Sequence, residues 1–165
     1  MMHIDARERN FIIGTTILLL IFGAAVLVSS FAFGFQVPAP IERIDPKIVA
    51  TPGSYPQYHW SDPVDERLRE IAPNKYEVYI LAQAWNYQPS QIRVPVGSTV
   101  TFYLTSKDVQ HGFRLDGTNI NMMVLPGEIG RLTATFDEAG TFNFVCNEYC
   151  GVGHHTMFGQ LIVEP

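Results

Sequence analysis

The chain has 165 residues, 47% of them hydrophobic and 16% charged, with a formal net charge of −5 at pH 7. This length allows one globular domain and one further element, and it excludes two domains of ordinary size. The sequence contains no phosphate-binding loop, no haem-attachment C-x-x-C-H motif and no nucleophile–base pair with recognisable spacing. It also lacks a basic patch, so nucleic acid is not expected as a partner.

The N-terminal part carries most of the hydrophobic excess. Residues 11–35 contain no charged side chain. As a helix they would be about 37 Å long, enough to cross a hydrocarbon core of about 30 Å. A cleaved signal peptide is the alternative, because Ser30-Phe31-Ala32 resembles a cleavage site, but the apolar run of such a peptide is usually about 7–15 residues. The pattern predicts a retained transmembrane helix at 11–35, preceded by a cytoplasmic segment at 1–10.

Residues 36–74 hold seven of the eleven prolines. This composition is typical of a linker that runs over a surface and adds little to a core. Residues 62–71 have the signals of a short helix, with an aspartate that can cap the N-terminus and Pro63 at the first helical position. Pro73 would prevent its continuation. We therefore expect a Pro-rich linker that contains one short helix.

From Lys75 onward the sequence changes to strand-forming patterns. Several short runs are rich in β-branched and aromatic residues, and glycine or proline separates many of them. Such runs, with turns at regular spacing, are typical of a β-sandwich or barrel. The expected strands are 76–82, 91–94, 99–104, 130–136, 141–145 and 160–163. The chain is thus predicted to be mainly β, with one α-helix as its anchor.

Twelve residues near the C-terminus, C-N-E-Y-C-G-V-G-H-H-T-M, combine two thiols, two imidazoles and a thioether. Soft copper prefers this donor set, whereas calcium and magnesium do not. Two thiolates on one loop can each bridge two metals, so the loop suits a dinuclear copper cluster. Cys146 and Cys150 would be the bridges, His154 would cap one copper, and Met157 would be a weak axial ligand. The second copper needs a histidine from elsewhere, and His111, in Q-H-G-F, is well placed to supply it.

Two other interpretations of the cysteine pair are open. An extracytoplasmic domain with only two cysteines usually joins them in a disulfide bond. Close cysteine pairs also combine with histidine in zinc sites. Met157 and the distant His111 favour copper, because zinc seldom recruits methionine and a disulfide needs neither histidine.

The run C-x-E-x-C-x-x-x-H-x-x-M with an upstream H-G-F resembles the CuA site of cytochrome c oxidase subunit II. The similarity continues in A-W-N-Y-Q-P, S-K-D-V-Q-H-G-F, T-N-I-N, P-G-E and the closing M-F-G-Q-L-I-V. The matching motifs lie close together in residues 75–165, whereas the earlier part of the chain is similar mainly in its architecture. The resemblance implies a cupredoxin-like β-sandwich or barrel at 75–165, in which the last two strands flank the metal loop.

Two further site residues follow from this resemblance. The backbone carbonyl of Glu148 would be the remaining copper ligand. The carboxylate of Glu148 could bind a magnesium ion at the interface with a partner subunit, with ordinary solvation as the alternative. Trp85 is a candidate for the place where electrons enter, and it would pack with Tyr87 beneath the site.

Other residues near these ligands have expected structural roles. Asp108, three residues before His111, would either orient that histidine or form a turn. Gly151 and Gly153 would allow tight turns or a close approach of other groups to the backbone. His155 adjoins a candidate ligand and must point another way, so we expect it at the surface.

The resemblance also implies a function and a set of partners. The chain would be the electron-transfer subunit of a terminal cytochrome c oxidase, which takes electrons from cytochrome c or a small blue-copper protein. It would pass them to haem in oxidase subunit I, where O₂ is reduced to water with proton pumping. A single membrane helix and the sequence N-Y-Q-P point to the B-type branch of haem–copper oxidases. The site would then lie on the periplasmic side of the bacterial inner membrane, with lipid around the helix.

The charges that flank the predicted helix do not decide its orientation. Arg7 and Arg9 precede the helix, and Arg43 and Lys47 follow it, so the positive-inside count is nearly balanced. The resemblance and the copper chemistry favour a cytoplasmic N-terminus.

Three alternative functions are open. The CuA subunit of a nitric oxide reductase would share the same chemistry and differ only in its partner. A nitrous oxide reductase would carry this domain on a much longer chain. A membrane-tethered copper chaperone belongs to a different class of protein, and it would favour exposed ligands that exchange readily.

Overall fold

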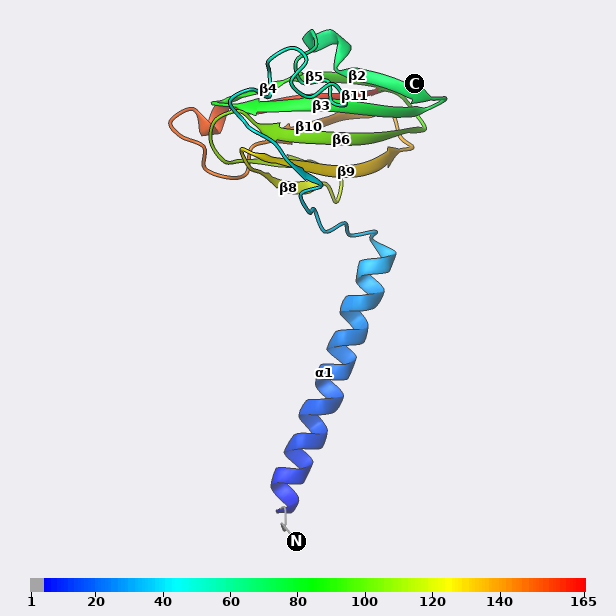
Figure 1. The fold of residues 1–165 in the computed structure, drawn as a ribbon. Helices are drawn as coiled ribbons and strands as arrows, with labels where there is room; N and C mark the ends of the chain where they lie inside the picture. The colour runs from blue at the N-terminus through cyan, green and yellow to red at the C-terminus, as the bar shows by residue number, and fades with distance from the viewer. Residues whose placement is uncertain (1–4) are drawn as a thin grey trace. The chain divides into compact units, whose positions relative to one another are not determined.

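The computed structural model describes residues 5–165. The chain divides into two compact units between Phe35 and Gln36. In the described part of the first unit there is one helix, α1, which spans Ala6–Ala32 (blue in Figure 1). Among the described residues, this helix alone is long and apolar enough to cross a membrane. None of its side chains is buried within the protein.

The ends of α1 differ from the predicted span of 11–35. The helix begins at Ala6 because the Asp5 carboxylate caps it, accepting a hydrogen bond from the Arg7 amide at 2.8 Å. Charged residues are therefore part of its first turns. The helix ends at Ala32, and Gly34 just beyond it has a φ of +59°, which is incompatible with a continuing right-handed helix.

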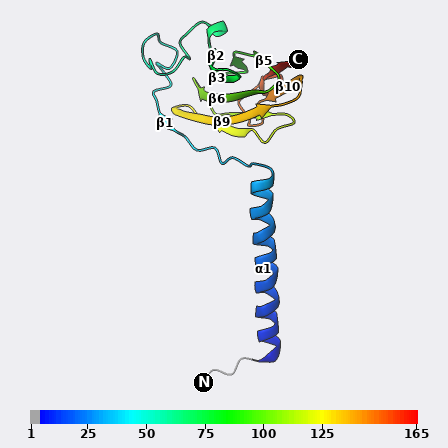
Figure 2. The same cartoon turned by 90° about the vertical axis from the view of Figure 1, so that its right-hand side faces the viewer.

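The second unit is a sandwich of two sheets, as Figures 1 and 2 show from two sides. The fold is mainly β, as predicted. Strands β3 (Lys75–Gln83) and β6 (Ser98–Ser106) pair in parallel, as do β5 (Gln91–Pro95) and β11 (Phe158–Glu164), and the other pairs are antiparallel. One sheet has the order β1 (Glu42–Arg43), β9 (Glu128–Phe136), β6 (Ser98–Ser106), β3 (Lys75–Gln83) and β2 (Leu68–Ala72), with β4 (Asn86–Gln88) pairing with β3. The other has the order β5 (Gln91–Pro95), β11 (Phe158–Glu164), β10 (Gly140–Val145), β7 (His111–Leu115) and β8 (Asn121–Val124).

Side chains that alternate along the strands fill the space between the sheets. In β6, Val100, Phe102 and Leu104 are fully buried, as the period-2 pattern predicts. Phe102 packs on Phe113 of the other sheet, with ring centroids 5.8 Å apart. Each such side chain contributes about 1.5–3 kcal/mol on burial. This core supports the end of the sandwich at which the candidate ligands lie.

The short helix predicted at residues 62–71 is wrong. A single 3-10 turn covers Val64–Glu66, and the chain then enters β2. β2 pairs with β3 in antiparallel register, with Leu68 opposite Val78. Asn74 makes the turn between them with a φ of +58°, a conformation that asparagine tolerates well. Pairing with a neighbouring strand therefore overrides the local helix signals.

The Pro-rich segment also contributes to a second core, contrary to the expectation of a linker on the surface. Trp60 is only 1% exposed, and its ring stands edge-on to that of Tyr79 at 5.9 Å. β1 pairs with β9, so the segment also covers an edge of the sheet. The buried residues of this second cluster are Ile44, Val49, Trp60, Tyr79, Leu81 and Ile129.

Candidate metal centre

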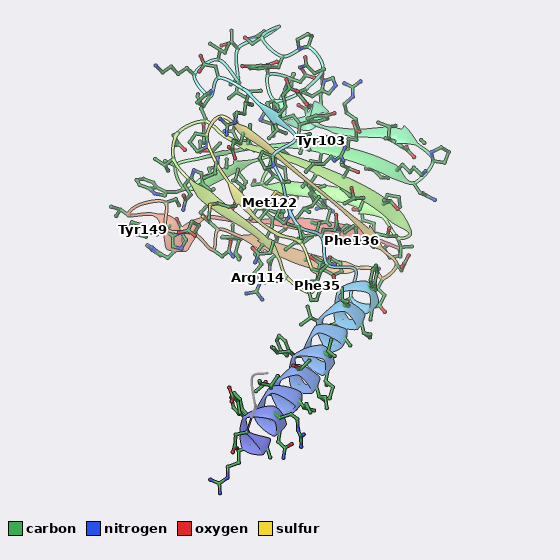
Figure 3. All side chains as sticks on the ribbon, turned by 60° about the horizontal axis from the view of Figure 1, so that its bottom comes forward. Phe35, Tyr103, Arg114, Met122, Phe136 and Tyr149 are labelled. Carbon is green, nitrogen blue, oxygen red and sulfur yellow. The ribbon has the colours of Figure 1, made fainter. Side chains whose placement is uncertain are left out.

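The loop between β10 and β11 carries most of the candidate ligands. These strands pair up to Val145 and Phe158, and the Cys146 amide donates to the Met157 carbonyl at 3.1 Å. The closed base brings the two ends of the loop together. The loop projects from one end of the sandwich (orange-red in Figure 1), and Tyr149 extends from its outer part in Figure 3.

The donor atoms of the loop lie close together. The Sγ atom of Cys146 is 3.1 Å from the carbonyl oxygen of Glu148 and 3.7 Å from the Sγ atom of Cys150. The Sγ atom of Cys150 is 3.6 Å from the Nδ1 atom of His154 and 3.7 Å from the Sδ atom of Met157. All five residues that sequence analysis assigned to this loop therefore converge.

His111 joins this group from the start of β7, which lies beside β10 in the same sheet. A ring nitrogen of His111 and the sulfur atoms of Cys146 and Cys150 lie within 4.8 Å of one another. The side chain of His111 is fully buried. Its Nε2 atom lies 2.9 Å from the Asp108 carboxylate, whereas its Nδ1 atom has no partner among the described residues.

Asp108 is itself held in place by several hydrogen bonds. Its carboxylate accepts from the amides of Ala84 and Val109, at 2.5 and 2.7 Å. Burial alone would raise the pKa of this carboxyl, but the hydrogen bonds from His111, Val109 and Ala84 outweigh burial and lower the pKa below its ordinary value. Asp108 is therefore an ionised acceptor. It keeps the His111 proton on Nε2 and leaves the Nδ1 lone pair free for a metal.

Gly112 also contacts the Cys146 sulfur, through its backbone amide. Its amide donates to the Cys146 Sγ atom at 3.5 Å, and its carbonyl accepts from the buried Tyr87 hydroxyl. A side chain at this position would not fit, because a Cβ atom would lie 2.1 Å from the Asn147 Oδ1 atom and 2.8 Å from the Glu148 amide nitrogen. Sequence analysis assigned no role to Gly112, although it stands within the H-G-F motif.

Trp85 lies against the metal loop. A Cβ atom on Gly153 would come within 2.5 Å of the Trp85 ring, and one on Gly151 within 3.2 Å. The two glycines thus allow the close approach that was expected of them. Tyr87 is buried beneath the loop, as predicted. The expectation that Trp85 also lies beneath the site is wrong, because Trp85 is 45% exposed and flanks the loop at the surface.

Two other residues of the loop have distinct surroundings. His155 is exposed, as expected, while the neighbouring His154 faces Cys150. Glu148 lines a cavity of about 190 Å³ together with Gly112, Asn121, Met122, Met123 and Asn147. Asn147 donates to the Asn121 side chain at 3.0 Å across this cavity. The T-N-I-N motif was noted in the sequence, but this contact was not foreseen.

These observations fit copper better than the alternatives. Cys146 and Cys150 are free, and their sulfurs are separated by 3.7 Å, whereas a disulfide bond is about 2.05 Å long. A buried imidazole nitrogen without a partner is costly unless something binds it. Sulfur, imidazole and thioether donors around one position form the ligand set of a soft metal such as copper.

Burial also affects the cysteine thiols. It raises the pKa of Cys150 to about 11, with a further contribution from the neighbouring Cys146. In the metal-free protein at neutral pH, Cys150 is therefore protonated, and a metal must displace its proton.

The last two strands of this β-sandwich flank a Cys–Cys–His–Met loop, and an adjacent strand supplies a second histidine. This arrangement is typical of copper-binding electron-transfer domains. A family model for the periplasmic domain of cytochrome c oxidase subunit II matches residues 55–164. The chain belongs to this family, which confirms the resemblance in the sequence. It is accordingly an electron-transfer subunit of a terminal oxidase complex, anchored to a membrane and assembled with partner subunits such as subunit I, and its family implies copper.

Individual relatives agree with this assignment. One cytochrome c oxidase subunit 2 of Thermus thermophilus is 39% identical over 161 residues, which cover 96% of this chain and 92% of that protein. Another subunit 2 from Thermus thermophilus is 45% identical over 129 residues, covering 78% of this chain and 91% of that one. A chain of a haem–copper terminal oxidase dimer solved by cryo-EM aligns with a TM-score of 0.75 and 33% identity, covering 96% of this chain and 99% of that chain.

Proposed function

We propose that the chain holds a dinuclear copper centre of the CuA type. Cys146 and Cys150 bridge the two ions, and His111 and His154 each cap one of them. Met157 and the backbone carbonyl of Glu148 are the weaker ligands. The observation that carries this proposal is the convergence of both sulfurs with a ring nitrogen of buried His111, whose Nδ1 atom has no partner among the described residues.

When bound, such a centre accepts and releases one electron at a time. The protein's residues keep the ligand geometry fixed between the two redox states, which keeps the reorganisation small. Asp108 orients His111, the Gly112 amide donates to Cys146, and the ladder of β10 and β11 closes the loop. These restraints come from strands and not from loops alone.

The partners follow from the family and from the surface around the loop. We infer that cytochrome c or a small blue-copper protein donates electrons near Trp85, Val152 and Phe158, which are 45%, 83% and 57% exposed. The acceptor is a haem in subunit I, where O₂ is reduced to water with proton pumping. The domain lies on the periplasmic side of a bacterial inner membrane, and α1 is surrounded by lipid.

We also infer that the Glu148 carboxylate binds a magnesium ion at the interface with subunit I. The cavity of about 190 Å³ beside this residue supports the inference. The one candidate membrane helix among residues 5–165 supports assignment to the B-type branch. A CuA subunit of a nitric oxide reductase has the same domain chemistry, and assaying the assembled complex with O₂ and with nitric oxide separates the two.

A metal count and an electron paramagnetic resonance spectrum test the copper centre. A fragment that begins at Gln36 should be soluble, because it omits the uncharged segment and contains the whole sandwich. We expect it to bind two copper ions, to turn purple, and in the half-reduced state to give hyperfine splitting from two equivalent copper nuclei. One copper per chain contradicts the dinuclear centre, a colourless protein indicates zinc or a disulfide, and rapid loss of copper to a chelator indicates a chaperone.

A further inference from the structure

A cavity of about 310 Å³ opens beside the metal loop, and Cys146 and Met157 form part of its wall. It lies on the outer face of the second sheet, where Asn143 and Val145 of β10 point away from the core side chain of Phe144. Phe158, at the start of β11, lies opposite Val145 and completes the wall. The residues that line the cavity are Asp116, Asn143, Val145, Cys146, His154, His155, Met157 and Phe158.

The lining contains two kinds of metal-binding side chain. Cys146, His154 and Met157 are candidate ligands of the copper centre itself. Asp116 and His155 are not, but the imidazole of His155 suits copper and the Asp116 carboxylate attracts a cation through its charge. Both are exposed, so they meet solvent before an ion reaches the buried sulfurs. Asp116 and His155 are thus more exposed to solvent than the candidate copper ligands in the same cavity.

Asp116 and His155 are both free to bind. Within residues 5–165, neither ring nitrogen of His155 makes a hydrogen bond to another residue. The Asp116 carboxylate lies 3.9 Å from the Arg114 guanidinium, with both side chains about half exposed. Figure 3 shows Arg114 projecting from the surface. An ion pair of this kind is weak in water, so it does not withhold Asp116 from a cation.

Two other sides of the metal loop and its surroundings are occupied by side chains. The ring of Trp85 lies over Gly151 and Gly153, and His111 is fully buried and bound to Asp108. The cavity beside Glu148 is lined by none of the sulfur or imidazole ligands.

We propose that Asp116 and His155 form a loading site, at which Cu⁺ released by a small chelator in solution binds before it passes to Cys146 and His154. The inference rests on the proposed copper centre. In the loading step Cu⁺ moves from the His155 imidazole, beside the negative charge of Asp116, to sulfur, and each thiol that binds it releases its proton to water in the cavity. The oxidation state of copper does not change.

The test measures the rate of copper uptake by the full chain in detergent, with its thiols reduced and oxygen excluded. The probe is Cu⁺ held by a chromophoric chelator, whose visible absorbance falls as the ion moves to the protein. We expect the variant Asp116→Asn/His155→Gln to load more slowly by about tenfold, because local attraction of a counter-ion raises association rates by about 10–10³. Its final copper content and its spectrum after oxidation should equal those of the unaltered protein.

Two control variants match these changes in chemistry. Asp137→Asn removes an exposed carboxylate on the turn after β9, and His59→Gln replaces an imidazole that hydrogen-bonds Asp62 elsewhere. Both should load at the unaltered rate. Equal rates for the cavity variant and the unaltered protein would overturn the loading site. Equal slowing in the controls, or a lower final copper content in the cavity variant, would overturn it too. If the unaltered chain binds no copper at all, the proposed function fails instead.

Discussion

The Asp108 carboxylate lies 2.9 Å from the Nε2 atom of His111, whose Nδ1 atom has no partner among the described residues. Because this contact fixes the imidazole proton, it determines which nitrogen can bind a metal. The contact therefore links a residue on the loop before β7 to the electronic properties of the candidate metal centre.

Replacing Asp108 should weaken copper binding without unfolding the sandwich. Asp108→Ala is expected to lower copper affinity by about 10–100-fold, the usual effect of removing a group that orients a ligand. Asp108→Asn should recover part of the loss, because its amide oxygen can still accept from Nε2. Competition with a chelator measures the affinity, and Asp137→Ala is the control for loss of surface charge. Equal affinities of Asp108→Ala and the control would show that the contact does not orient His111.

The stability of the metal-free protein should depend on the ionisation of Asp108 at low pH. Its folded pKa is lowered, so between the two pKa values the unfolded state binds more protons than the folded state. The stabilisation is present above the unfolded pKa and is lost as the pH falls through the folded value. Urea unfolding from pH 6 downwards should show a shallower loss in Asp108→Asn than in the unaltered protein. Parallel curves would exclude this contribution.

The two kinds of sulfur ligand should differ in their effects. Cys150→Ser should destroy the dinuclear centre, because one remaining thiolate cannot bridge both coppers in the same way. Met157→Leu removes only a weak ligand and keeps the volume, so the two-copper cluster should persist with a changed reduction potential. Visible spectra and copper counts distinguish these outcomes. Equal loss of the spectrum in both variants would contradict the division of roles.

Gly112 should not tolerate a side chain. In Gly112→Ala the Cβ atom would collide with the backbone of Asn147 and Glu148, so we expect a loss of about 1–3 kcal/mol in unfolding free energy, the usual cost of overpacking. Copper binding should weaken as well, because the loop must move. Gly140→Ala is the matched control, since its nearest neighbour would lie at an ordinary 3.7 Å. Urea unfolding compares the two, and equal stability would refute the argument from packing.

Electron transfer from the donor should depend only modestly on salt. Residues 36–165 carry 14 acidic and 9 basic side chains, a net charge of −5 (9 minus 14), which can attract a cationic donor. Several of the exposed side chains on or beside the loop are nevertheless hydrophobic, with Val152 and Tyr149 more exposed than Trp85. Stopped-flow rates measured with a cytochrome c over a range of ionic strength test this expectation. A steep fall in the transfer rate between low and physiological ionic strength would show that charge dominates docking. If apolar contact dominates instead, Val152→Ser should slow electron transfer.

Sequence patterns predicted the features that depend on neighbouring residues. The donors from Cys146 to Met157 lie within twelve residues, so any tight loop brings them together. The strand predicted at 99–104 is confirmed within β6, and Val100 and Phe102 on it are buried because burial alternates along a strand whatever its partner is. The uncharged segment likewise predicted a membrane helix, since that depends on composition and length alone.

The tertiary structure decided the features that depend on distant partners. Residues 68–72 became a strand because β3 offered unpaired backbone groups, and Trp60 became a core residue because Tyr79 lies beside it. The position of Trp85 on Gly151 and Gly153 brings together segments more than sixty residues apart. Local propensities amount to at most about 1 kcal/mol per residue outside proline, whereas one buried aromatic side chain contributes about 1.5–3 kcal/mol. The sequence alone therefore determined the ligands and the strand pattern, while long-range packing determined how the ligands are oriented and covered.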